Sequence, residues 1–153
     1  QGRNKRPPKD NVNAMLSFVY TLLTNQITSA LEVVGLDPYV GFLHTLRPGR
    51  ASLALDMMEE LRAYLGDRFV LSLINKRQIT SKDFLSQGDQ GVVMTDKGKK
   101  VFISAWQARK REVMTHPYLN EKIEIGLLPY AQSMLMARFI RQDIDDYPVF
   151  LIK

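Results

Sequence analysis

The stretch VNAMLSFVYTLLTNQITSALEVV, residues 12–34, decides the fold class. Its apolar side chains recur every three or four residues, which is the spacing of one face of an α-helix. They are Leu16, Val19, Tyr20, Leu23, Ile27, Ala30, Leu31 and Val34. Asp10 or Asn11 can cap the first turn, and Gly35 is typical of the position after a helix end. We therefore expect a helix of about six turns at the centre of a helical bundle.

Two further helices are predicted after the loop that follows this segment. The first begins at Ser52 and runs to about Leu65, with an apolar stripe and a separate acidic stripe. Gly66 is expected to interrupt it, and Asp67 can start the next helix. In that next helix, apolar residues from Phe69 onward point inward.

The C-terminal half predicts two more helices. One begins at Thr95 or Asp96, carries Val113 in its apolar stripe, and ends at the His116-Pro117 dipeptide. The other covers about residues 127–141. Between the helix that starts at Asp67 and the helix that begins at Thr95 or Asp96, the segments around residues 84–86 and 92–94 favour a small β-hairpin. The expected fold is mainly α: a multi-helix domain with at most one small β-hairpin.

The composition is that of one ordinary globular domain. The chain has 153 residues, of which 45% are apolar and 24% are charged. These values exclude a disordered or collagen-like chain. The formal net charge of +5 suggests a polyanionic partner, and four of the basic residues lie in an exposed arm over residues 1–10.

Several kinds of site are excluded by the residues that the sequence lacks. It has no cysteine, so it cannot form a disulfide or a thiolate metal site. Its two histidines cannot build a three-histidine zinc site. No apolar run reaches the roughly 18 residues of a membrane span, and no signal peptide opens the chain. We expect a cytoplasmic protein.

One group of residues could carry chemistry. His44 lies in a loop ahead of the helix that begins at Ser52, and Asp56 and Glu59 lie three residues apart on that helix. An imidazole with one or two carboxylates suits Mn²⁺ or Mg²⁺, which can activate a hydroxyl against a phosphodiester. Surface carboxylate pairs are commonly solvated, however, and a lone histidine is commonly a packed side chain. The spacing alone leaves both interpretations open.

Several stretches together resemble a known family. They are Arg6-Pro7-Pro8, GLDPYVGFLH at 35–44, SLALDMMEELR at 52–62 and LSLINKR at 71–77. They are similar to the CRISPR-associated integrase that inserts new spacers. The GLLP run at 126–129 and the YPVFL segment at 147–151 resemble the type I-C branch of that family.

The resemblance implies a helical C-terminal catalytic domain with one divalent cation, Mn²⁺ or Mg²⁺. The family binds this ion through a Glu, a His and a second acidic residue. His44 matches the histidine, Glu59 matches the second acidic residue, and Asp56 is a third candidate beside it. The family also has an N-terminal β-rich domain that forms a homodimer, and a small ferredoxin-like CRISPR-associated partner protein bridges two such dimers.

The chain departs from the family pattern at its start. The first family ligand, a glutamate, lies upstream of Arg6-Pro7-Pro8, as does the β domain. Residues 1–153 are therefore expected to be a C-terminal fragment that is weakly active or inactive alone.

The activity expected of the parent protein is metal-dependent cleavage of double-stranded DNA and its integration into a CRISPR array, by 3′-hydroxyl attack on a phosphodiester. The residues expected to bind DNA phosphates are Arg47, Arg50, Arg62, Lys76 and Arg77. The alternative is a non-catalytic helical DNA-binding or scaffold module, which needs no metal.

Overall fold

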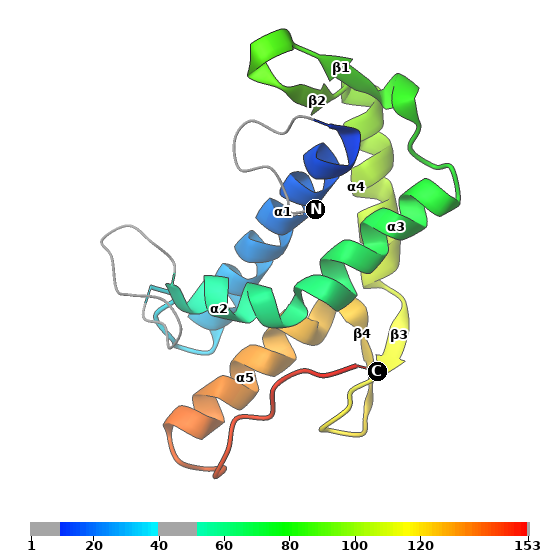
Figure 1. Cartoon of the computed structure of the whole chain (residues 1–153). Coiled ribbons are helices and arrows are strands. Elements are labelled where there is room, and N and C mark those ends of the chain that lie inside the picture. The colour runs from blue at the N-terminus through cyan, green and yellow to red at the C-terminus, as the bar shows by residue number, and fades with distance from the viewer. Residues whose placement is uncertain (1–9, 40–51, 153) are drawn as a thin grey trace.

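The computed structural model describes residues 10–39 and 52–152, and its long first helix runs through the middle of the fold (Figure 1). This helix, α1, spans Asn11–Val33. The Asp10 carboxylate caps it by accepting the Asn13 backbone N–H at 2.8 Å, and Gly35 ends it with a φ of +86°. Its buried stripe includes Val19, Leu23, Ile27 and Leu31. The predicted central helix is confirmed, and so is the mainly α fold class.

The next helical run is continuous through Gly66. α2 (Ser52–Leu61) passes into the π-helical segment η1 (Arg62–Asp67) and then into α3 (Arg68–Asn75). A Cβ at Gly66 would lie 3.0 Å from Cε1 of Tyr20, and the Tyr20 hydroxyl donates a hydrogen bond to Asp67. Gly66 therefore gives α1 room to approach η1. The predicted interruption at Gly66 is wrong, because the backbone stays helical through it. The predicted start of the next helix at Asp67 is confirmed, because α3 begins at Arg68 with Asp67 in the position before it.

A short hairpin separates α3 from α4. It pairs β1 (Phe84–Ser86) with β2 (Val92–Met94) in antiparallel register, which confirms the predicted hairpin. Two 3₁₀ turns, η2 (Ser81–Asp83) and η3 (Gly88–Gln90), adjoin its strands. α4 (Asp96–Lys110) then begins at Thr95, whose hydroxyl accepts the Gly98 N–H at 3.0 Å.

A second hairpin occupies the segment in which α4 was expected to continue. β3 (Val113–Thr115) pairs with β4 (Lys122–Glu124), so the described residues form two small hairpins where the sequence predicted at most one. The side chain of Val113 is 60% exposed, which corrects its predicted place in the core. The chain leaves α4 early because the Ile125 N–H donates to the Glu112 carbonyl, which closes the hairpin against the helix end.

The last helix and the C-terminal segment close the bundle. After the 3₁₀ turn η4 (Ile125–Leu127), α5 (Leu128–Ile140) begins with Pro129 in its first turn, as predicted. The segment after α5 returns along the molecule toward β3 and β4 (Figure 1). Phe150 is only 4% exposed, so this apolar segment docks on the domain instead of extending into solvent.

Aromatic rings hold α1, α3 and α4 together in the core. Phe102 of α4 packs edge-to-face against Phe18 of α1 at 5.0 Å and against Phe69 of α3 at 5.2 Å between ring centroids. Trp106 packs on the same Phe69 ring at 5.1 Å. Such pairs add about 0.5–1.5 kcal/mol beyond the burial of their area. In the described segments, no helix is long and apolar enough to cross a membrane.

Candidate functional site

The acidic face of α2 lies beside a pocket. Apolar residues of α2 pack inward, and Leu53, Ala54, Met57 and Leu61 are all buried. The carboxylates at positions i, i+3 and i+4 therefore share another side of the helix. They line a pocket of about 450 Å³, which we call the acidic pocket. Its lining residues are Leu53, Asp56, Met57, Glu59, Glu60, Met136, Phe139, Tyr147 and Val149.

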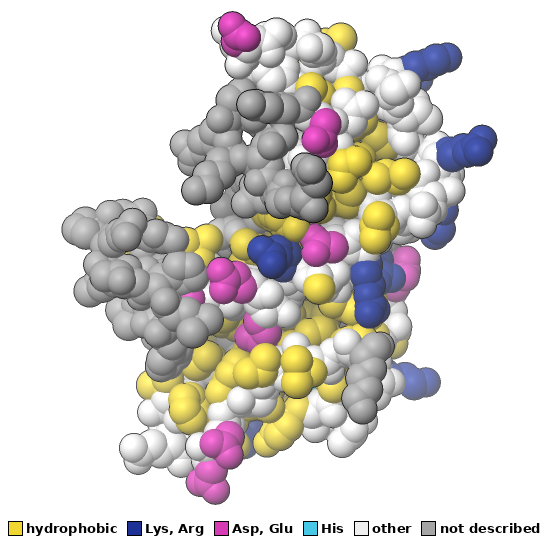
Figure 2. Space-filling view, in the orientation of Figure 1, with side chains coloured by type: hydrophobic (Ala, Val, Ile, Leu, Met, Phe, Trp, Pro, Cys, Tyr) yellow, Lys and Arg dark blue, Asp and Glu magenta, His cyan; other side chains and the backbone are white. Residues whose placement is uncertain are grey.

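The three carboxylates differ in their exposure. Asp56 is 9% exposed, Glu59 is exposed and Glu60 is intermediate. In the space-filling view, acidic side chains gather over α2, with apolar side chains around them (Figure 2). The pocket therefore combines apolar walls from α5 and the C-terminal segment with carboxylate oxygens from α2.

Glu60 is held by a set of buried donors. Its Oε2 accepts the Phe150 backbone N–H at 2.6 Å and the Gln132 side-chain amide at 2.8 Å. The Tyr147 hydroxyl lies 2.8 Å from both carboxylate oxygens. A buried carboxylate needs such donors because it has lost its hydration. Glu60 therefore fastens the C-terminal segment to the end of α2.

His116 completes this network from the second hairpin. Its Nδ1 accepts the backbone N–H groups of Tyr118 and Leu119, both at 3.1 Å. Its Nε2 must then carry the proton, which it donates to Gln132 Oε1 at 2.6 Å. His116 and Gln132 are both fully buried. The expectation that His116 ends a helix is wrong, since it closes a turn between β3 and β4 and braces Gln132. We call the side chains of Glu60, His116, Gln132 and Tyr147 the Glu60 network.

Burial affects the ionisation of Glu60 and Tyr147. It raises the pKa of Glu60, and the hydrogen bonds from Phe150, Tyr147 and Gln132 oppose this rise. Burial also raises the pKa of Tyr147, as does the charge of the adjacent Glu60 carboxylate. Tyr147 therefore keeps its proton and acts as a donor. The polar Gln132 within the apolar run of α5 is the signal in the sequence that could have indicated this network.

The other predicted site residues are spread over the chain. His44, Arg47 and Arg50 lie outside the described residues. Arg62 lies on η1, with its Cζ 5.9 Å from the centroid of the Tyr20 ring. Lys76 follows the last residue of α3, and Arg77 comes next with a φ of +56°.

The structure thus brings Asp56 and Glu59 to one pocket, whereas Lys76 lines a different groove.

Two of the described carboxylates have the chemistry of cation ligands. No three His, Asp or Glu side chains of the described residues form a group that could hold an ion. Asp56 and Glu59 fit two positions of a hard, oxygen-binding divalent cation such as Mg²⁺ or Mn²⁺. Glu60 is less suited, because its oxygens already accept hydrogen bonds from three residues.

Comparison with known proteins places this geometry in a family. The family model of the CRISPR associated protein Cas1 matches residues 1–108. The chain belongs to the Cas1 family. It is 58% identical, over 151 residues, to "CRISPR-associated endonuclease Cas1 1" of Chlorobaculum tepidum. The match covers 99% of this chain and 44% of that protein, so the chain spans less than half the length of this Cas1 relative.

Solved structures show the same fold. A Cas1 protein from Thermotoga maritima superposes with a TM-score of 0.81 and 31% identity, over 91% of this chain and 42% of that one. A casposase bound to its integration product also gives a TM-score of 0.81, with 26% identity, over 92% of this chain and 40% of the casposase. The α2–α5 arrangement that carries the acidic pocket therefore lies within a fold that Cas1 proteins and a casposase share.

Proposed function

We propose that this chain carries part of the catalytic centre of a metal-dependent DNA endonuclease and integrase. The observation that carries the proposal is the placement of Asp56 and Glu59 on one face of α2, lining one pocket. The name of the Chlorobaculum relative, an endonuclease, and the integration product held by the casposase support the same reaction class. The sequence of the C-terminal segment supports assignment to the type I-C branch.

In this proposal, His44, Glu59 and Asp56 hold one Mn²⁺ or Mg²⁺ ion together with a ligand from upstream of this chain. The ion, when bound, supplies Lewis-acid polarisation of a phosphodiester and favours ionisation of an attacking 3′-hydroxyl. The two α2 carboxylates neutralise its charge. Arg47, Arg50, Arg62, Lys76 and Arg77 bind phosphates of double-stranded DNA through charge-assisted hydrogen bonds.

The proposed assembly follows from the family resemblance. The complete protein forms a homodimer through an N-terminal β-rich domain, and a small ferredoxin-like CRISPR-associated partner protein bridges two dimers. We propose that residues 1–153 by themselves are weakly active or inactive, because the chain spans less than half the length of the Chlorobaculum relative. Titration of residues 1–153 with Mn²⁺ should therefore show weak binding, and tight one-to-one binding would contradict this proposal.

The proposal is tested in the complete gene product that carries this chain. Glu59→Gln and His44→Ala should each reduce strand transfer by at least about a hundredfold, the scale on which removal of one transition-state contact acts. DNA affinity should stay within about threefold of the unsubstituted protein. Glu32→Gln on the exposed side of α1 is the matched control and should cleave normally. Full strand transfer by Glu59→Gln would overturn the role of Glu59 as a metal ligand. Absence of strand transfer in the unsubstituted protein, with DNA binding retained, would favour a DNA-binding or scaffold module.

A further inference from the structure

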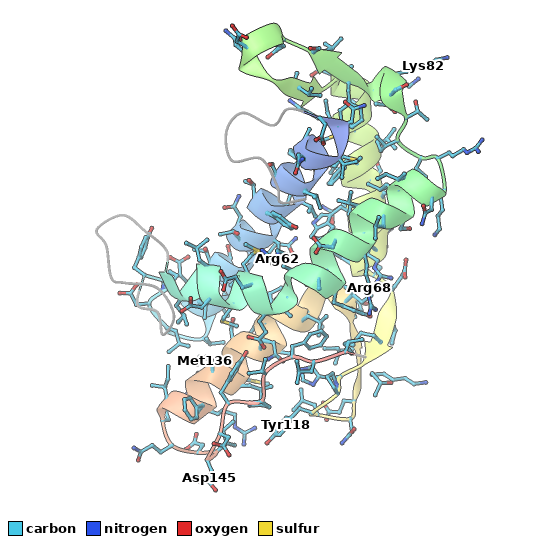
Figure 3. The ribbon with its side chains drawn as sticks, in the orientation of Figure 1. Arg62, Arg68, Lys82, Tyr118, Met136 and Asp145 are labelled. Carbon is cyan, nitrogen blue, oxygen red and sulfur yellow. The ribbon has the colours of Figure 1, made fainter. Side chains whose placement is uncertain are left out.

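A second hollow lies between α3 and α4 and contains no residue of the acidic pocket. It has a volume of about 270 Å³, and we call it the α3–α4 groove. Its lining residues are Arg68, Phe69, Ser72, Lys76, Gln78, Ala105, Ala108, Arg109 and Glu112. Figure 3 labels Arg68 at this side of the molecule and Met136, a wall residue of the acidic pocket, on α5.

The spacing of the lining residues explains the shape of the groove. Arg68, Ser72 and Lys76 are four residues apart on the α3 side, so they form one row along the helix. Successive members of the row are about 6 Å apart along the helix axis. The facing positions on α4 include Ala105 and Ala108, whose small side chains leave the space open.

Stacking on one tyrosine orders two guanidinium groups at this groove. The Cζ atoms of Arg68 and Arg109 lie 5.1 and 5.6 Å from the centroid of the Tyr64 ring. Cation–π contacts at these distances restrict side chains that otherwise have many rotamers. Tyr64 is itself braced by the docked C-terminal segment, since its ring packs against Phe150 at 5.5 Å.

Positive charge exceeds negative charge in the groove. Arg68, Lys76 and Arg109 face a single carboxylate, Glu112, which pairs with Arg109 at 2.8 Å. Within residues 10–39 and 52–152, no carboxylate lies within ion-pair distance of Arg68 or Lys76. Ser72 and Gln78 add neutral hydrogen-bond donors. These groups are suited to an anion with several oxygen acceptors in a row.

We propose that the α3–α4 groove binds the phosphate backbone of a nucleic-acid strand, outside the site of cleavage. A strand carries a charge at every nucleotide whatever its sequence, so each position of the α3 row meets a phosphate. An acidic protein segment would need carboxylates spaced to match. The choice of DNA as the probe rests on the proposed function. Arg68 and Arg109 thereby become DNA-contacting residues together with Lys76.

The test measures binding of a short fluorescent DNA duplex to the full chain in EDTA, at salt concentrations from about 50 to 200 mM. Arg68→Ala and Lys76→Ala should each flatten the slope of log affinity against log salt by about 0.9. The double variant should bind on the order of tenfold more weakly at the lowest salt. Glu112→Gln should bind more tightly, because it removes the carboxylate from the groove.

Arg138→Ala on the exposed side of α5 is the matched control and should keep the affinity and slope of the unsubstituted chain. Thermal unfolding of each variant shows whether it is folded. Unchanged slopes in folded Arg68→Ala and Lys76→Ala would overturn the proposal. Displacement of the duplex by polyglutamate at equal charge concentration would assign the groove to acidic protein instead. The binding assay contains EDTA and therefore does not depend on metal. The cleavage assay of Glu59→Gln is a separate measurement, so the groove proposal and the catalytic proposal can fail independently.

Discussion

Glu59 and Glu60 are neighbours in the chain, and the fold gives them opposite environments. Glu59 is exposed at the rim of the acidic pocket. Glu60, one residue later, accepts hydrogen bonds from Tyr147, Gln132 and the Phe150 backbone. The difference teaches that burial against the C-terminal segment, rather than position in an acidic stripe, sets the environment of a carboxylate on α2. Glu60 fastens the C-terminal segment to α2, whereas Glu59 is the carboxylate that we propose as a metal ligand.

Removal of the Glu60 carboxylate should have the largest effect on stability. Glu60→Ala leaves the Tyr147 hydroxyl, the Gln132 amide and the Phe150 N–H without their shared acceptor. Unsatisfied buried groups cost about 1–3 kcal/mol each, so the free energy of unfolding should fall by about 3 kcal/mol. Urea unfolding measures this change, and Glu32→Ala on the exposed side of α1 is the control. A loss no larger than that of the control would show that the network does not stabilise the domain.

A smaller substitution tests the contribution of Tyr147 to the Glu60 network. Tyr147→Phe keeps the ring and removes only the hydroxyl that donates to Glu60 at 2.8 Å. The expected loss is about 1 kcal/mol of unfolding free energy, with faster proteolysis of the C-terminal segment. Tyr130→Phe, at a 43% exposed tyrosine on α5, should unfold like the unsubstituted chain. Equal free energies of unfolding for Tyr147→Phe and Tyr130→Phe would show that the Tyr147 hydroxyl does not contribute to the stability of the Glu60 network.

The sequence predicted those features that depend on neighbouring residues. The spacing of apolar residues in α1, the cap at Asp10 and the acidic stripe on α2 are local patterns, and the structure confirms α1, its cap and the shared placement of Asp56 and Glu59. The spacing of apolar residues within one helix predicts which side of that helix is buried, even when the element that packs against it is unknown.

The Glu60 network could not be predicted in this way, because it joins residues far apart in the chain. Glu60 and Phe150 are 90 residues apart, and Glu60 and Gln132 are 72 apart. The second hairpin was missed for a related reason: the Ile125 N–H bonds to Glu112 across the hairpin, while the helical spacing of local apolar residues continues past Lys110. Gly66 was misread because its neighbour Tyr20 belongs to another helix.

Asp10 extends the comparison to a carboxylate that is exposed and hydrogen-bonded, and it should give the smallest effect. The Asn13 backbone N–H and side-chain amide lower the pKa of Asp10 below its ordinary value of 3.8, the opposite direction to Glu60. The folded state therefore favours the ionised form. Its stabilisation is complete above the ordinary pKa and is lost as the pH falls through the lowered folded-state pKa.

Asp10→Ala should reduce the free energy of unfolding by about 0.5–1 kcal/mol at neutral pH, the usual cost of losing a helix N-cap. Asp10→Asn keeps an oxygen that can cap α1 but does not titrate, so the stability difference between it and the unsubstituted chain should change below about pH 4. Urea unfolding at several pH values measures this difference. A difference that stays constant across that range would show that the charge of Asp10 adds nothing to the stability that its cap provides.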